Sequence, residues 1–111
     1  MADGLPSPYA ERVLDLVERV PAGRVVTYGD VAAHLREGGP RQVGRVMALF
    51  GGGVPWWRVV RASGQPAQGH EREALRRLRD DGTPLVVDGS RVDLAAARWD
   101  PSARRRRSRV V

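Results

Sequence analysis

Apolar residues recur at helical spacing through the first half of the chain, and helix start and stop signals bound each run. The first helix is predicted to begin with Ser7 as its N-cap and Pro8 at the first helical position. The Pro-Ala-Gly sequence at residues 21–23 is predicted to end it, and residues 24–26 to be extended. The apolar residues of its inward face are Tyr9, Val13, Leu16, Val17 and Val20.

Two further helices are predicted on either side of a glycine pair. Thr27 and Asp30 resemble a capping box, which predicts a second helix over about residues 28–36. Pro40 predicts the start of a third helix, which ends at the glycine run 51–53. The inward residues of these helices are Val31, Ala32, Leu35, Val43, Val46, Met47 and Phe50. Two short helices joined by a glycine turn have the shape of a helix-turn-helix.

The second half of the chain is predicted to hold one extended segment, one helix and one hairpin. Residues 54–60 are apolar and predicted to be extended, and about residues 69–81 form a fourth helix. Residues 85–87 and 91–94 flank an Asp-Gly pair at 88–89, which favours a tight primed turn. The expected fold is therefore mainly α with a small β-hairpin, as a winged-helix-like helix-turn-helix domain.

Length and charge divide the chain into one small domain and a basic tail. The 111 residues contain 19 basic residues, all arginine, and 13 acidic ones, for a net charge of +6. Five of these arginines lie close to the end of the chain, at Arg104, Arg105, Arg106, Arg107 and Arg109. The other 14 arginines nearly balance the 13 acidic residues. We therefore expect a domain over residues 1–102 and a tail over 103–111 that charge repulsion keeps disordered.

The residue inventory offers little to conventional catalysis. There is no cysteine, which removes disulfides, thiolate metal sites and a cysteine nucleophile. His34 and His70 lie on predicted helices without partners at metal-ligand spacing, so both are expected to be solvated. We predict no catalytic residue, no metal and no cofactor. There is no apolar run of about 18 residues and no secretory signal, so the expected location is the cytoplasm.

Adjacent tryptophans at 56 and 57 are the least usual feature of the extended segment. Adjacent side chains on a strand point to opposite sides, so Trp56 and Trp57 are expected to face a cavity and the core, one each. An indole on a cavity wall is suited to stack on a nucleobase. The alternative is that both tryptophans are core anchors. The arginines nearby, which are either DNA contacts or a solvated face, are Arg41, Arg45, Arg58 and Arg61.

Three motifs together carry a family resemblance that covers about residues 9–101. Residues 20–32, VPAGRVVTYGDVA, and 40–47, PRQVGRVM, resemble the DNA-binding domain of O6-alkylguanine-DNA alkyltransferases. Residues 54–60, VPWWRVV, stand where these enzymes carry Pro-Cys-His-Arg-Val-Val. Trp56 replaces the alkyl-accepting cysteine, which is the hallmark of the alkyltransferase-like proteins. The chain is therefore identified as resembling that subfamily.

The resemblance implies a role for each matching residue. Tyr28 would crowd the phosphate beside the target nucleotide and face the flipped base, and Arg41 would enter the minor groove and fill the vacated space. The DNA-binding residues implied in this way are Tyr28, Arg41, Gln42, Gly44 and Arg45. The implied lesion pocket comprises Tyr28, Trp56, Arg58 and Val59. Backbone carbonyls near Trp56 and Val59 would accept from the guanine amino group, and Arg58 would be more structural than base-reading.

The chain departs from the family pattern at two places, and both bear on lesion selectivity. Trp57 stands where the family has histidine, and Asp81 lies near the glutamate that orients that histidine, which leaves Asp81 nothing comparable to orient. Residues 65–69 form a shorter loop than in relatives and contain no arginine, whereas some relatives bring an arginine from this loop to the lesion.

The function that we expect is a non-enzymatic DNA-damage sensor, because the acceptor cysteine of the methyltransferases is missing. It would bind double-stranded DNA containing O6-alkylguanine as a monomer, flip the damaged base and flag it for nucleotide excision repair proteins. It would be associated with the nucleoid when bound to DNA. The alternative is a winged-helix transcription regulator, which would normally need a dimer and a palindromic site. An enzyme that uses another residue has little support in the inventory.

Overall fold

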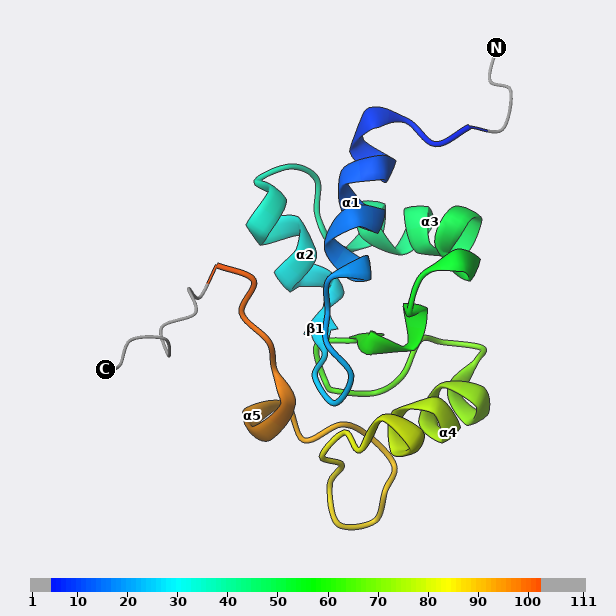
Figure 1. The fold of residues 1–111 in the computed structure, drawn as a ribbon, viewed down its shortest axis with the longest axis vertical. Helices are drawn as coiled ribbons and strands as arrows, with labels where there is room; N and C mark the ends of the chain where they lie inside the picture. Colours follow the sequence, from blue (N-terminus) through cyan, green and yellow to red (C-terminus); the bar gives the residue numbers. More distant parts are fainter. Residues whose placement is uncertain (1–4, 103–111) are drawn as a thin grey trace.

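The computed structural model describes residues 5–102, and in this range the chain is mainly helical, as predicted (Figure 1). The expectation of a disordered tail concerns residues 103–111, which lie outside the described range. The helices of the described range are α1 (Pro8–Glu18), α2 (Tyr28–Leu35), α3 (Pro40–Phe50), α4 (Glu71–Asp81) and α5 (Leu94–Ala97). Two 3₁₀ turns, η1 (Gly51–Gly53) and η2 (Trp56–Arg58), and two strands, β1 (Val26–Thr27) and β2 (Val59–Val60), complete it.

Helix α1 begins where the sequence predicts and ends earlier. The Ser7 hydroxyl oxygen accepts a hydrogen bond from the Ala10 N–H at 3.1 Å, and Pro8 opens the helix. Regular helix stops at Glu18, because the next two N–H groups bond to carbonyls three residues back. Val20 is nevertheless buried, so this tighter turn keeps the predicted inward face in the core.

Local capping positions α2 and α3 as predicted. The Thr27 hydroxyl accepts from the Asp30 N–H at 2.9 Å, and the Asp30 carboxylate accepts from the Thr27 N–H at 3.0 Å, which completes a capping box. At the start of α3, the Gly39 N–H donates to the side-chain oxygen of Gln42 at 2.9 Å. The turn between α2 and α3 passes through Arg36 in the left-handed conformation, with φ 58°.

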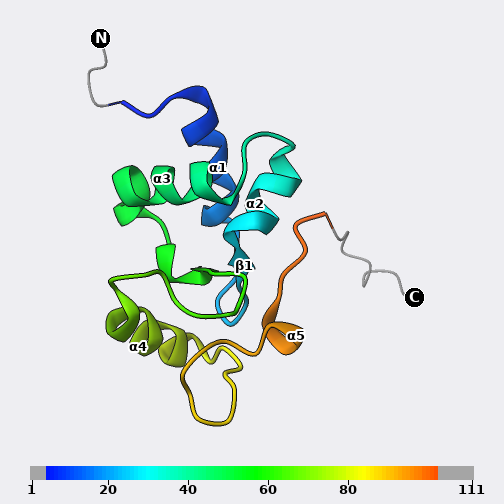
Figure 2. The same ribbon diagram turned by 180° about the vertical axis from the view of Figure 1, so that it is seen from behind.

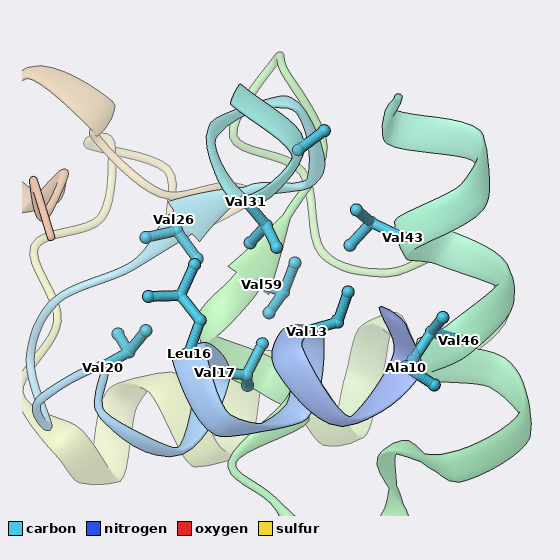
Figure 3. Close-up of a cluster of buried hydrophobic side chains, with 11 residues drawn as sticks. Ala10, Val13, Leu16, Val17, Val20, Val26, Val31, Val43, Val46 and Val59 are labelled. Carbon is cyan, nitrogen blue, oxygen red and sulfur yellow. The ribbon is translucent and has the colours of Figure 1, made fainter. Parts of the chain in front are cut away.

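The strands form one parallel pair that lies between two hydrophobic cores. Val26 pairs with Val59 and Thr27 with Val60, and helices α1, α2 and α3 lie on the opposite side of this pair from α4 and α5 (Figure 2). The first core gathers apolar residues of α1, α2, α3 and the strands (Figure 3), and its buried members are Ala10, Val13, Leu16, Val17, Val20, Val26, Val31, Ala32, Val43, Val46 and Val59. The buried members of the second core are Val25, Val60, Leu78, Val92 and Ala97.

The predicted hairpin is reduced to a single antiparallel bridge between Leu85 and Val92. A primed turn of type I′ needs positive φ at both central residues, and in the Asp-Gly pair only Gly89 has it, at 74°. After the bridge, Asp93 caps α5 by accepting from the Ala96 N–H at 3.4 Å, so the chain turns into a helix where a strand was predicted. Leu94 therefore begins α5 and does not extend the strand.

Candidate functional site

A cavity of about 700 Å³ lies between helices α2 and α3 on one side and the loop of residues 61–70 on the other. Trp56 and the glycine turn after α3 close it. The residues that line it are Tyr28, Pro40, Arg41, Gly44, Met47, Ala48, Gly51, Gly52, Trp56, Arg61, Ala67, Gln68 and His70. The structure thus brings together four of the predicted site residues, namely Tyr28, Arg41, Gly44 and Trp56.

Tyr28 is the first residue of α2, and the capping box before it fixes its backbone. A Cβ atom on Gly44 would lie 4.0 Å from the Tyr28 ring, an ordinary contact distance, so α3 passes directly beside this face of the tyrosine. Burial raises the pKa of the Tyr28 phenol, although the Arg61 charge opposes this effect. The phenol is therefore protonated at neutral pH and remains a hydrogen-bond donor.

The N-terminal half of α3 carries the two predicted DNA-binding arginines. Arg41 lines the pocket, whereas Arg45, one turn further along, is exposed outside it. Within residues 5–102 neither guanidinium has a hydrogen-bond or ion-pair partner. Gln42 lies between them, and its side chain caps the helix through Gly39. Arg41 is thus an unpaired cation at the positive end of the α3 dipole, and Arg45 adds a second cation one turn further on, which is a favourable arrangement for phosphate groups.

The two tryptophans point in different directions, as predicted. Trp56 lines the pocket, and Trp57 packs against the second core, with the ring centroids 5.8 Å apart and the planes at 88°. The extended segment that suggested this arrangement is not formed, because both residues lie in the η2 turn. The edge-to-face contact between the rings is a favoured aromatic geometry.

Asp81 binds both residues that follow Trp56. The Trp57 indole N–H donates to one Asp81 carboxylate oxygen at 2.9 Å, and Arg58 donates to the two oxygens at 2.8 and 3.0 Å. Partial burial raises the pKa of Asp81, but the hydrogen bonds from Arg58 and Trp57 outweigh it and hold that pKa below its usual value. The expectation that Trp57 leaves Asp81 nothing comparable to orient is therefore wrong, because the Trp57 indole N–H donates to this carboxylate.

Arg58 and Val59 do not line the pocket, contrary to the site predicted from the sequence. Arg58 is turned toward Asp81 and the Val20 carbonyl, which it reaches at 3.0 Å. The Val59 side chain is fully buried in the first core. The Trp56 carbonyl accepts the Val59 N–H. That these carbonyls read a guanine amino group stays a prediction.

Two polar residues that line the cavity, Arg61 and His70, were not among the predicted pocket residues, although Arg61 was one of the arginines grouped near the tryptophans. The His70 ring lies 5.8 Å from the Trp56 ring at 64°, so this histidine is part of an aromatic pair although it is exposed. Arg61 directly follows β2, and this closeness in sequence to Trp56 is the signal that grouped it with the nearby arginines. His34 is exposed on α2, away from this pocket.

The described part of the chain shows two further absences. No three potential metal ligands among histidine, cysteine, aspartate and glutamate come together within residues 5–102. In the same range, no helix is both long and apolar enough to cross a membrane.

The sequence is similar to proteins that act on DNA. The profile of the family described as "6-O-methylguanine DNA methyltransferase, DNA binding domain" matches residues 8–82. A DNA base-flipping protein of Escherichia coli (strain K12) is 36% identical over 103 residues, covering 83% of this chain and 74% of the relative. The DNA base-flipping protein of Shigella flexneri matches to the same extent.

The fold is similar to solved complexes with DNA. The structure of S. pombe Atl1 with damaged DNA containing O6-carboxymethylguanine matches with a TM-score of 0.71 and 27% identity, covering 82% of this chain and 94% of that one. The structure of S. pombe ATL with DNA matches with a TM-score of 0.69 and 26% identity over the same shares.

Proposed function

The chain belongs to the family of the 6-O-methylguanine DNA methyltransferase DNA-binding domain, and on this premise we propose that it is a non-enzymatic sensor of alkylated DNA. It binds duplex DNA that contains O6-alkylguanine, rotates the damaged nucleotide out of the helix and holds the base in the pocket. The observation that carries the proposal is the position of Trp56. By the motif resemblance this residue stands at the cysteine position of the family, and it forms a wall of the same cavity as Tyr28 and Arg41.

The pocket residues have different roles in base flipping. Extrusion of a base costs a few kcal/mol of stacking and pairing. The planar guanidinium of Arg41 has no partner in the described protein and is free to enter the vacated space in the duplex. Trp56 offers an indole face to the extruded base, and the protonated Tyr28 hydroxyl donates a hydrogen bond. Sequence-tolerant binding follows, since the minor groove distinguishes base pairs poorly.

The same arrangement explains why binding would not lead to repair. Alkyl transfer in the family needs a thiolate, and the chain has no cysteine. Trp56 has no ionisable nucleophile and fills the acceptor position. We propose that a bound monomer marks the lesion for nucleotide excision repair proteins. A winged-helix regulator without lesion specificity is the competing function, and it predicts equal affinity for damaged and intact duplexes.

The test is a pair of measurements on the full chain with one duplex sequence, with and without a single O6-methylguanine. We expect tighter binding of the lesion duplex and a larger change in tryptophan fluorescence, which a Trp56→Phe variant loses because Trp57 and Trp99 lie outside the pocket. With a labelled methyl group and excess protein, no label should reach the protein. Equal affinity for both duplexes would favour the regulator, and labelled protein would reveal an enzyme.

A further inference from the structure

The loop of residues 61–70 places basic side chains on one wall of the pocket, and no acidic side chain lines any of its walls within residues 5–102. Resting on the function proposed above, we propose that Arg61 and His70 contact the substituent of the flipped guanine. In this role they favour an anionic O6-carboxyalkyl group over a neutral group of the same size. They are thus specificity-determining residues of the pocket.

Arg61 is held in place by its own loop. Its Nε–H donates to the Pro66 carbonyl at 2.9 Å, and its backbone N–H donates to the Gln65 carbonyl at 2.9 Å. Pro66 is buried, so the loop presents the guanidinium from a fixed anchor. These bonds use one of the five guanidinium N–H donors, so the terminal nitrogens, of which Nη2 lies near the Glu71 carboxylate, make no hydrogen bond within the loop and can contact a ligand.

The charge of Arg61 is only weakly compensated. Its nearest carboxylate is that of Glu71, at 3.5 Å between Nη2 and Oε2, and 36% of the Arg61 side chain and 47% of the Glu71 side chain are exposed. Solvent screens such a pair, so Glu71 reduces the positive potential in the pocket without cancelling it. The influence of Arg61 extends across the cavity, because its charge lowers the pKa of the Tyr28 phenol against the effect of burial.

His70 adds a hydrogen-bonding group beside the surface on which the base would stack. Its ring meets the Trp56 ring at 64° with 5.8 Å between centroids, so the imidazole borders the indole and does not cover it. The opposite wall is apolar or backbone, formed by Met47, Ala48 and the glycines of η1. An anionic substituent therefore finds a charged partner in Arg61 and a hydrogen-bonding partner in His70 on the side of the 61–70 loop, apart from Arg41 at the first turn of α3.

Two lesions of matched shape separate charge from size. Duplexes of one sequence would carry either O6-carboxymethylguanine or O6-carbamoylmethylguanine, in which a neutral amide replaces the carboxylate. We expect the carboxymethyl lesion to bind about tenfold more tightly, which is the ratio expected when a neutral hydrogen bond becomes charge-assisted. Arg61→Gln should abolish most of this preference, and His70→Phe, which keeps a ring against Trp56, should reduce it about two- to threefold.

Two further variants serve as controls. Arg72→Gln removes an exposed arginine outside the pocket and should leave the preference unchanged. Glu71→Gln keeps an oxygen to accept the Gly69 N–H, removes the competing carboxylate and should increase the preference. The Glu71 variant also keeps the test open if Arg61→Gln disturbs the loop.

The possible outcomes separate this inference from the proposed function. Equal binding of the two lesions, with both bound more tightly than intact DNA, would overturn the anion preference and leave the sensor function intact. Failure to prefer either lesion over intact DNA would overturn the sensor function itself. An equal loss for all duplexes in Arg61→Gln would identify a phosphate contact, which also contradicts this role for Arg61.

Discussion

The indole N–H of Trp57 donates to the Asp81 carboxylate across 2.9 Å, and this bond joins the turn below the pocket to helix α4. Arg58 donates to the same carboxylate oxygen through Nε and to the second oxygen through Nη2. The Trp57 ring also lies beneath the guanidinium groups of Arg58 and Arg77, at 5.3 and 4.6 Å from the ring centroid. Because Trp57 contacts Trp56 edge to face, α4 holds the pocket indole in place without lining the pocket.

Removal of the Asp81 charge should destabilise the fold. Asp81→Asn keeps an oxygen for Trp57 but loses the two-oxygen pair with Arg58, whose side chain is only 17% exposed. We expect the free energy of unfolding in urea to fall by about 2 kcal/mol. Glu73→Gln is the matched control, since Glu73 on the same helix pairs with Arg76 and Arg77 in solvent, and it should have a smaller effect. Equal losses in the two variants would contradict this account.

Stability should decline in acid through Asp81 and Asp30. Burial raises the pKa of each carboxyl, but hydrogen bonds from Arg58 and Trp57 in one case, and from Arg98 and Thr27 in the other, bring it below the usual 3.8. A lowered folded-state pKa contributes stability that is complete above about pH 4 and is lost as the pH falls through the folded value. Urea unfolding at pH 7 and pH 3 should show a smaller difference between wild type and Asp81→Asn at pH 3.

Two glycines with the same backbone conformation offer a test of the 61–70 loop. Gly64 and Gly69 have φ of 89° and 88°, but a Cβ atom would lie 2.5 Å from the Val92 carbonyl oxygen at Gly64 and would meet nothing within 4 Å at Gly69. Gly69→Ala should cost about 1 kcal/mol of unfolding free energy from backbone strain alone. Gly64→Ala should cost about 1–3 kcal/mol more, because the loop must move away from Val92. Similar losses would show that this contact is dispensable.

Base extrusion should depend on Tyr28 and Arg41. Arg41→Ala should weaken binding to lesion DNA by roughly 1–3 kcal/mol, the scale of one lost stacking contact. A fluorescent base analogue at the target position reports extrusion, which the Tyr28→Ala/Arg41→Ala double variant should diminish. Arg36→Ala removes an exposed arginine outside the pocket and is the charge-matched control. Undiminished extrusion in the double variant would remove both residues from the mechanism.

The basic tail should strengthen binding to any duplex. Deletion of residues 103–111 removes five arginines from a chain whose other charges nearly balance. Affinity for damaged and intact DNA should fall together, and the slope of log affinity against log salt should become flatter, because fewer counterions are released. A slope that does not change on truncation would mean that the tail makes no phosphate contact.

Sequence reasoning succeeded where the decisive interactions are local. The Ser7 cap, the Thr27–Asp30 capping box and the Pro40 helix start each involve residues within one turn. The pairing of residues 26–27 with residues 59–60 depends on packing between distant segments, and no sequence motif predicts it. The pocket follows the same division, because the motif residues Tyr28 and Trp56 both line the cavity, whereas their predicted roles toward DNA stay predictions.

The pocket residues that were missed, and the hairpin that was not formed, have tertiary causes. His70 reaches Trp56 only after the 61–70 loop folds back, and sequence spacing does not report such a return. Asp93 could either continue a strand or cap a helix, and the packing of Ala97 into the second core accompanies the helical choice.

The two-residue strand β2 forms a partition shared by both cores, with Val59 on one side and Val60 on the other. Shear motion needs an interface that can slide and hinge motion needs one that can separate, and a close-packed wall buried on both faces resists both. The two halves of the molecule therefore cannot swing apart without unfolding either core. A flipped base would then enter a pocket that is already formed. The rate of association should therefore be set by extrusion of the base from the DNA and not by a closing motion of the protein.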